Sequence, residues 1–526
     1  MIDFVVRRSD TLIGLSSSVL VSPTAWREVA RINRLSNPNR ISTGLRLRIP
    51  TRLLRSEAVD ATFFSVSGDV RNGDSPAVAG AAVGEGRSVE TGPAGSAVIA
   101  LADGSRVRMP PSSLAQVVAS RNYGGRLPAP MESNASAGGP DHWFAGTLRL
   151  LRGSVEVFAT KLLRAKPLEV VTPTAVVGVR GTQYRVGLDE DANGRTRAEV
   201  IEGAVRLDAA AAAFGADVPT GFGAAIDADA ALPAVVRLLS APDLSTLPER
   251  FERPVVRFRL DEPAPLRIQV ASDPGFDKVV SDQKVGAGAE ARIVGLADAQ
   301  WFLRARRIDT QGIEGFDASR PFVLKARPEP PAYRTPRADA KQAVGTVDFA
   351  WAPNAQAPRA RLQIALDAAF VRLVSDQDNI DTASQRADIA EPGPYHWRLA
   401  SVRPEGDQGP FGDTQRFVLR PVPEPAAVSQ SHDGGLLVFR WSGRDGDRQQ
   451  VEFARDAAFT RIVASGEFTG SEWQLAAPAG GGWHYFRYRS IEPDGFVSPY
   501  SETLRVEVPR DWSGLGLLLP LLLLLL

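Results

Sequence analysis

The seventeen residues from Val170 to Val186, V-V-T-P-T-A-V-V-G-V-R-G-T-Q-Y-R-V, indicate a β-rich fold. Their valines and tyrosine favour strands, whereas Gly178 and Gly181 let the backbone turn sharply or approach another segment closely. Arg180 lies between those two glycines. An arginine in this position either pairs with a carboxylate inside the β-structure or contacts a protein partner. Both interpretations stay open, and Arg180 is our candidate for protein interaction.

The composition extends this prediction to the whole chain. At about 100 to 200 residues per domain, 526 residues predict about three to five domains. Lysine plus arginine equals aspartate plus glutamate, at 61 each, so no net field would draw the chain to nucleic acid or to an anionic membrane. The absence of cysteine excludes disulfide bonds, thiolate metal sites and a cysteine nucleophile. We therefore expect a mainly β, multidomain protein.

Residues 60–231 carry short apolar runs separated by glycines, without helical periodicity. This pattern predicts one β-rich domain, either a solenoid or a sandwich. The order of its motifs resembles the FecR-type domain, through A-D-G-S at 102–105, R-G-S-V at 152–155 and E-G-A-V at 202–205. The resemblance implies extracytoplasmic sensing or scaffolding.

Signalling members of the FecR family place an anti-sigma segment and a membrane helix before this domain. Residues 1–59 contain neither. A transmembrane signalling regulator whose membrane and anti-sigma parts lie outside this chain is therefore kept as the alternative function.

Residues 1–52 are predicted to form a small module of strand, helix, helix and strand. Ser9 to Leu12 offers helix-capping chemistry, and apolar residues follow with helical spacing until a strand ends at Pro50. The module resembles a LysM domain, through Ser9-Asp10-Thr11-Leu12, Asn33-Arg34-Leu35 and the G-x-x-L-x-I-P run that starts at Gly44.

The LysM resemblance implies binding of peptidoglycan or a related N-acetylglucosamine glycan. Its groove would lie between the loop after the first strand and the loop before the second. The residues carried over as glycan-binding candidates are Asp10, Thr11, Leu12, Asn33 and Leu35. From the residues alone, Asp10 is also expected to cap the first helix, and the two roles are compatible.

A repeat occupies residues 251–327, 328–421 and 422–509, after an expected linker at 232–250. The motif φ-x-φ-A-x-D-x-x-F occurs three times, where φ is an apolar residue, and an arginine in a later strand repeats with the same spacing. The aspartates are Asp273, Asp367 and Asp456, and the arginines are Arg304, Arg398 and Arg487. Repeats of this length, rich in alternating strands, resemble fibronectin type III β-sandwiches. The repeated aspartates and arginines are expected to be turn and strand-packing residues.

Catalysis finds little support in the sequence, and we predict neither an enzyme nor a cofactor. The four histidines lack metalloprotease spacing, and there is no G-x-S-x-G motif. The run Asp189 to Gly194 reads D-x-D-x-N-G, but Val200 stands where a calcium loop needs a glutamate, so a hairpin turn is expected instead.

The chain ends give the last expectations. No secretory signal peptide is visible, yet the resemblances imply the periplasm or cell envelope. Residues 510–526 form an apolar, leucine-rich tail, and the run from Gly514 is too short to span a bilayer as a helix. The predicted partners are the glycan and an unidentified envelope protein, with membrane contact only through this tail.

Overall fold

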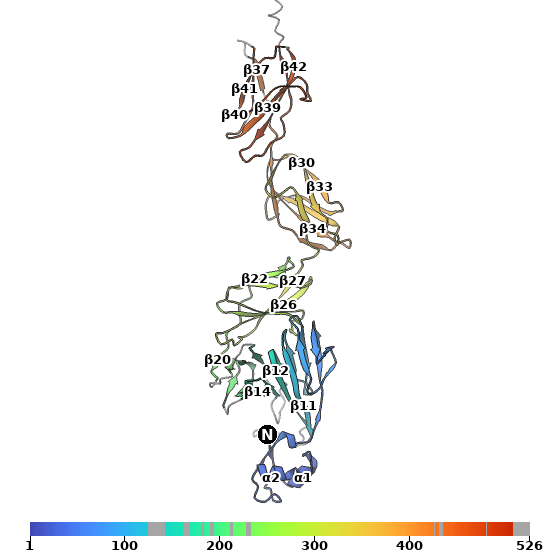
Figure 1. Ribbon diagram of the computed structural model, residues 1–526, viewed down its shortest axis with the longest axis vertical. Coiled ribbons are helices and arrows are strands. Elements are labelled where there is room, and N and C mark those ends of the chain that lie inside the picture. The colour runs from blue at the N-terminus through green and yellow to red at the C-terminus, as the bar shows by residue number, and fades with distance from the viewer. Residues whose placement is uncertain are drawn as a thin grey trace, which may run out of the picture. The chain divides into compact units, whose positions relative to one another are not determined.

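The computed structural model describes residues 1–124, 142–160, 168–179, 183–189, 194–210, 214–227, 233–424, 427–430, 435–479 and 481–508. The chain divides into two compact units, Met1–Lys325 and Ala326–Leu526. Strands dominate both units (Figure 1), which confirms the predicted mainly β fold class. Among the described residues, no helix is both long and apolar enough to cross a membrane.

The N-terminal module has the expected order of elements. These are β1 (Ile2–Val5), α1 (Leu12–Ser18), α2 (Trp26–Ile32) and β2 (Arg46–Ile49), followed by a 3-10 turn at Thr51–Leu53. Strands β1 and β2 pair antiparallel, with Ile2 opposite Ile49. Their buried side chains pack under both helices, and the same hydrophobic core includes Tyr123 and Trp143 from the next domain. The two rings stack with centroids 4.3 Å apart, so the module shares its core with that domain.

The FecR-like domain, residues 56–237, consists of two facing layers of strands that close into a flattened barrel. In hydrogen-bonded order, the first layer contains β18 (Gly215–Pro219), β17 (Ala204–Ala209), β14 (Ala175–Val179), β13 (Leu168–Val171), β12 (His142–Phe158), β11 (Leu114–Gly124), β8 (Ser88–Thr91), β5 (Val70–Asn72) and β6 (Ser75–Pro76), with β3 (Ser56–Ala58) also on β11. The second contains β20 (Val235–Arg237), β19 (Phe222–Ile226), β16 (Thr196–Glu202), β15 (Gln183–Leu188), the end of β12, β10 (Arg106–Met109), β9 (Ser96–Ala100), β4 (Ala61–Ser67) and β7 (Ala82–Val83).

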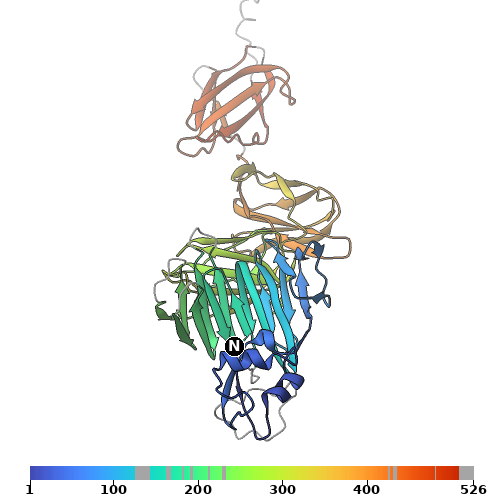
Figure 2. The same ribbon diagram turned by 60° about the horizontal axis from the view of Figure 1, so that its bottom comes forward.

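Strand β12 belongs to both layers, and Gly153 marks the change. Before it, the strand pairs with β11 and β13; from it onward, the strand pairs with β10 and β15. Gly153 has φ +76°, and a Cβ there would lie 2.6 Å from the hydroxyl oxygen of Ser113. Only glycine fits such a position without strain. The R-G-S-V motif therefore marks this crossing. The strands of the FecR-like domain lie side by side in Figure 2, and buried valines, isoleucines and leucines fill the core between its two layers.

The segment expected to be a linker, 232–250, is packed against the first unit in its described part. It carries β20 and three buried leucines, Leu238, Leu244 and Leu247. Burial of these leucines removes apolar surface from water, which favours a packed segment over an extended one.

Three two-sheet sandwiches follow, as the repeat predicts. The first pairs β21 (Arg250–Phe251), β27 (Ala318–Leu324), β26 (Ala299–Arg307), β23 (Leu266–Ala271) and β24 (Val279–Val285), facing β22 (Val256–Arg259) and β25 (Glu290–Ile293). The second pairs β29 (Ala340–Ala343), β36 (Gln415–Arg420), β34 (Gly393–Val402), β31 (Arg359–Ala365) and β32 (Leu373–Ile380), with β35 (Gln408–Phe411) on β34, and a sheet of β28 (Ala332–Thr335), β30 (Gly345–Ala352) and β33 (Ser384–Ile389). The third pairs β40 (Ile462–Thr469), β39 (Arg448–Ala454), β42 (Gly482–Ile491) and β43 (Leu504–Val508), and separately β37 (Ala427–Gln430), β38 (Leu436–Arg440) and β41 (Glu472–Ala476).

Candidate functional site

The repeated motif of the sandwiches builds a turn, as the sequence predicts. Each aspartate accepts hydrogen bonds from backbone N–H groups a few residues later in the chain. The Lys278 N–H, for example, donates to the Asp273 carboxylate at 2.8 Å. The phenylalanine of each motif has a positive φ, 53–58°. This places its ring under the repeated arginine, whose guanidinium carbon lies 3.9–4.4 Å from the ring centroid in Arg304, Arg398 and Arg487. The repeated residues are thus structural.

Thr11, rather than Asp10, caps the first helix of the N-terminal module. The Thr11 hydroxyl accepts from the Gly14 N–H at 3.0 Å. Asp10 closes the preceding turn, because its carboxylate accepts from the Arg7 N–H at 2.7 Å. Leu12 is 2 % exposed and belongs to the core, so its side chain is not available at the surface. Of the three glycan-binding candidates in this loop, Thr11 is the one with an exposed side chain.

Asn33 joins the end of α2 to β2. Its amide nitrogen donates to the carbonyls of Val29 and Arg48 at 2.8 and 2.9 Å, and its amide oxygen accepts from the Arg48 N–H at 2.7 Å. Leu35 is partly buried against the module core. Both residues therefore shape the loop after α2.

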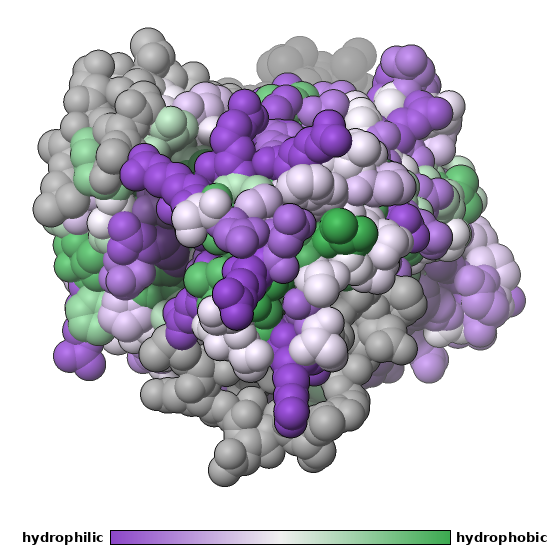
Figure 3. Space-filling view, turned by 90° about the horizontal axis from the view of Figure 1, so that it is seen from below, coloured by the Kyte–Doolittle hydropathy of each residue, from purple (hydrophilic) through white to green (hydrophobic). Residues whose placement is uncertain are grey.

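The two loops that the LysM resemblance assigns to the glycan lie against each other. The Val6 N–H donates to the Leu45 carbonyl at 2.9 Å, and the Gly44 N–H donates to the Val6 carbonyl at 2.8 Å. Hydrophilic side chains dominate this end of the molecule, with hydrophobic ones in small groups between them (Figure 3). Ile13, at the start of α1, is 61 % exposed and is the most exposed aliphatic side chain near these loops.

Several other residues and segments singled out from the sequence lie wholly or partly outside the described residues. Arg180 lies outside the described residues, as do Asp191 and Asn193 of the D-x-D-x-N-G run and the leucine-rich tail. Asp189 pairs with Arg197 at 2.9 Å. Over the described ranges, no group of three histidine, aspartate or glutamate side chains could hold a metal ion.

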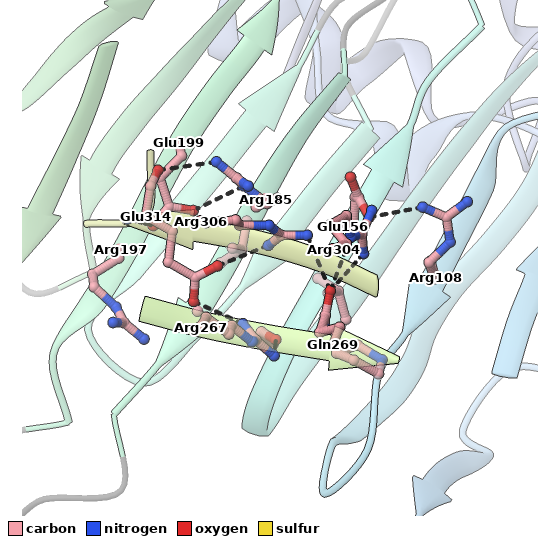
Figure 4. A pocket seen from close by; sticks show the side chains of 15 residues that line it. Arg108, Glu156, Arg185, Arg197, Glu199, Arg267, Gln269, Arg304, Arg306 and Glu314 are labelled. Carbon is pink, nitrogen blue, oxygen red and sulfur yellow. Dashed lines mark hydrogen bonds and ion pairs between the residues drawn. The ribbon is translucent and has the colours of Figure 1, made fainter. Parts of the chain in front are cut away.

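A cluster of charged side chains lies between the second layer of the FecR-like domain and the first sandwich, and the sequence did not reveal it (Figure 4). Except for Arg267, every member is at least nine-tenths buried. This charge cluster comprises Arg108 of β10, Glu156 of β12, Arg185 of β15, Arg197 and Glu199 of β16, Arg267 and Gln269 of β23, Arg304 and Arg306 of β26, and Glu314.

The FecR-like domain reaches the sandwich through two arginines. Arg108 bridges Glu156 of its own layer at 2.8 Å and Asp277 of the sandwich at 2.7 Å. Arg185 donates to the carbonyls of Glu314 and Gly315 at 2.9 and 2.7 Å. Both arginines therefore bind the neighbouring domain through charge-assisted hydrogen bonds.

The first sandwich also contributes arginines to the charge cluster. Glu314 accepts from Arg267 and from Arg306, each at 2.7 Å. Arg304 lies 3.4 Å from the Glu156 carboxylate and also donates to Gln269 at 2.7 Å. The Glu314 N–H donates to Glu199 at 3.2 Å, so the hydrogen bonds alternate between the two domains.

Burial and pairing shift the pKa values of these acids in opposite directions. Burial alone would raise the pKa of Glu156, but Arg304, Arg306 and Arg108 outweigh it and hold that pKa far below its ordinary value. For Glu199, burial and the nearby Glu314 outweigh Arg185, so the pKa is raised. Burial and Arg306 together lower the pKa of Arg304 to about 10.

The cavity inside the cluster measures about 20 Å³. That volume holds about one water molecule. The surrounding charges bind one another across the interface, so the arrangement fixes two domains together and leaves no room for a substrate. One sequence pattern could have indicated the cluster. Charged and apolar residues alternate in some strands, as from Arg106 to Met109, and this alternation predicts a strand with one polar face.

The comparisons with known proteins agree with the predicted domain type. Residues 87–206 match the family model described as FecR protein, which confirms the FecR resemblance for that part of the chain. Among curated proteins, none matches this chain.

Similar solved structures fall into two groups. A candidate anti-sigma factor from Parabacteroides distasonis is 14% identical, with 28% of this chain and 59% of that chain covered and a TM-score of 0.21. The fibronectin(III)-like modules of Clostridium thermocellum CbhA are 14% identical, over 34% and 94%, with a TM-score of 0.22. Chicken CNTN1 FN1–FN3 domains are 13% identical, over 52% and 97%, with a TM-score of 0.21. The chain thus spans about six tenths of the length of the first of these.

Proposed function

We propose that this protein is a non-enzymatic scaffold of the cell envelope, which holds peptidoglycan or a related N-acetylglucosamine glycan through residues 1–52 and presents its FecR-like domain to an envelope protein. The observation that carries the proposal is the contact between the loop after β1 and the loop before β2, at Val6 and Leu45. It supports the proposal because it brings together the two loops between which the LysM resemblance assigns the glycan groove.

The shared core supports a mechanical role for the N-terminal module. Because Tyr123 and Trp143 pack into the module, a glycan bound there would be connected rigidly to the FecR-like domain. The charge cluster then connects that domain to the first sandwich. A force applied to the bound glycan would thus pass through packed, described elements as far as the first sandwich.

Binding to purified peptidoglycan sacculi tests the proposal. Ile13 and Val78 are both exposed aliphatic residues, at 61 % and 64 %, and they lie in the module and in the FecR-like domain respectively. In a sedimentation assay with the full chain, we expect Ile13→Glu to abolish retention and Val78→Glu to leave it unchanged. Failure of the unmodified chain to sediment, or equal loss in both variants, would reject glycan binding.

The match to the FecR family model favours a second function, regulation of signalling across the membrane. That function would need membrane and anti-sigma parts beyond this chain. A transcription profile of source cells that lack the gene separates the two: loss of a defined sigma-factor response favours regulation, whereas envelope defects without such a response favour the scaffold.

A further inference from the structure

One turn recurs at the same place in all three sandwiches. It follows the strand that carries the repeated arginine, and it occupies residues 309–312, 403–406 and 492–495. In each copy the last residue is a glycine with a φ of 80–92°, and its N–H donates to the carbonyl of the first residue at 2.9–3.1 Å. We call this turn the joint turn, because in the first and third sandwiches it contacts the domain that precedes it in the chain.

In the first sandwich, arginines of the FecR-like domain bind the joint turn. Arg197 of β16 donates to the Gly312 carbonyl at 2.6 Å, and Arg185 of β15 donates to the Glu314 carbonyl, just after the turn, at 2.9 Å. The side chains of these arginines are only 5% and 4% exposed. The polar contacts of this first joint therefore lie away from solvent.

Apolar packing closes the same joint. Ile313, next to the turn, is 2% exposed. Its Cγ2 atom lies so close to Gly223 of β19 that a Cβ built on that glycine would be 2.6 Å from it. Such packing stabilises the joint by removing apolar surface from water, and salt does not screen that contribution.

In the third sandwich, the joint turn binds the second sandwich through its own carboxylates. Glu492 accepts from Lys341 of β29 at 2.9 Å and from Arg420 of β36 at 3.1 Å. Asp494 also pairs with Lys341, and Arg444 of the third sandwich lies 4.0 Å from the Glu492 carboxylate. As in the first joint, the preceding domain supplies the cations and the joint turn supplies the acceptors.

This second joint is more open to water than the first. Within their unit, the side chains of Lys341, Arg420 and Asp494 are 23%, 28% and 50% exposed. The groove beside them measures about 690 Å³, which is room for many water molecules and salt ions. Phe496, which stands where the first sandwich has Ile313, is only partly buried. Salt screens ion pairs that water reaches far more than it screens buried ones.

Exposed ion pairs also contribute little to stability, because their attraction in water barely exceeds the cost of ordering the two side chains. A joint held by such pairs is therefore easily shifted between closed and open. The chain between the second and third sandwiches keeps the partners close to each other when the pairs break, so the joint can close again.

We propose that the joint between the second and third sandwiches is an electrostatic latch centred on Glu492. The latch is closed at low ionic strength, with these ion pairs formed, and it opens as the ionic strength rises. The joint between the FecR-like domain and the first sandwich stays closed over the same range. The position of the third sandwich relative to the second would then respond to the salt around the protein, independently of the glycan binding proposed above.

Distances between paired spin labels test the latch in the full chain, which contains no cysteine of its own. Ala368→Cys and Ala457→Cys place labels at equivalent exposed positions of the second and third sandwiches. Double electron–electron resonance should give one narrow distance distribution at about 0.05 M NaCl and a broad one at about 1 M NaCl, where the Debye length falls to about 3 Å. Val78→Cys and Val294→Cys, both at exposed positions, report on the first joint and should give the same distribution at both salt concentrations.

A matched pair of variants tests the role of the glutamate. Glu492→Gln removes the charge, but the turn should persist because its hydrogen bonds use the backbone. This variant should give the broad distribution already at low salt. Glu472→Gln is the control, because that carboxylate pairs with Arg440 inside the third sandwich at 2.9 Å. The control should behave like the parent labelled chain at both salt concentrations.

Every other outcome would overturn the latch. A broad distribution in the parent chain at low salt would show that the two sandwiches are not joined, and a narrow one at high salt would show that exposed charges do not hold them. A narrow distribution in Glu492→Gln at low salt would exclude that residue as the centre of the latch, and broadening at the first joint would remove the difference between the joints. Equal melting temperatures of the two variants, and a circular dichroism spectrum that salt does not change, exclude unfolding as the cause of broadening.

Discussion

Glu156 of β12 and Arg304 of β26 lie 3.4 Å apart although 148 positions separate them in the sequence. Their contact crosses from the FecR-like domain to the first sandwich, and Arg108 binds the same carboxylate at 2.8 Å. A buried carboxylate between two arginines stabilises the interface only while all members stay ionised, because any single loss leaves an uncompensated charge. The joint therefore depends on ionisation as well as on packing.

Glu156→Gln should destabilise the first unit by about 3 kcal/mol at pH 7, because it removes the buried carboxylate that Arg108 and Arg304 share and leaves each arginine with one acidic partner, Asp277 and Asp317 respectively. The folded state holds the pKa of Glu156 below its ordinary value of 4.5, so this stability is present above pH 4.5 and declines as the pH falls further. The difference between the two proteins should thus shrink by about 1.4 kcal/mol per pH unit below that value. Urea unfolding between pH 3 and pH 8 measures it, and a difference that does not vary with pH would contradict the assignment.

Glu199→Gln should have the opposite dependence on pH. The pKa of Glu199 is raised by burial, so its stabilising contribution is present below pH 4.5 and is lost as the pH rises toward the folded-state pKa. A glutamine can still accept from the Glu314 N–H, which lies 3.2 Å from Glu199. In the same urea series, this variant should equal the unmodified protein at acidic pH and be as stable or more stable at pH 8. A clear loss of stability at pH 8 would show that Glu199 is ionised and stabilising.

Trp143→Ala should loosen the N-terminal module from the FecR-like domain. Trp143 is 6 % exposed and stacks on Tyr123 inside the shared core. Its replacement by alanine leaves a cavity and should lower the free energy of unfolding by about 3–5 kcal/mol. Hydrogen exchange should quicken across residues 1–54 while β23 and β26 keep their protection. Trp483→Ala is the control, because that tryptophan is 47 % exposed in the third sandwich. Unchanged exchange in the module would contradict a shared core.

Local patterns in the sequence predicted much of this structure. The D-x-x-F motif predicted the turns of three sandwiches, because Asp273 and its equivalents bind backbone groups only a few residues away. The order of elements in the N-terminal module was predicted for the same reason. Helix capping was placed one residue early, at Asp10, since aspartate and threonine are both good caps and only the geometry separates them.

The candidate sites were harder to predict. Leu12 and Asn33 belong to the motif that resembles LysM, yet the structure uses one in the core and the other to join α2 to β2. A sequence motif contains residues that the fold needs as well as residues that bind a ligand, and the motif alone does not separate the two. The charge cluster was missed because its two halves come from strands far apart in sequence, and alternation along a strand does not identify the sheet that will cover it.

The repeated aspartate of the second sandwich gives the last prediction. Asp367 accepts hydrogen bonds from the N–H groups of Arg372, Val371 and Ala369, at 2.8, 3.1 and 3.1 Å, and these bonds lower its pKa. The turn they hold sets the positive φ of Phe370, on which Arg398 stacks. Asp367→Ala should therefore lower the melting temperature of the second unit by a few degrees. Asp381→Ala, an exposed residue of the same sandwich, should leave the melting temperature unchanged. If Asp367→Ala melts like the unmodified protein, the turn is held by the chain around it and the aspartate is dispensable.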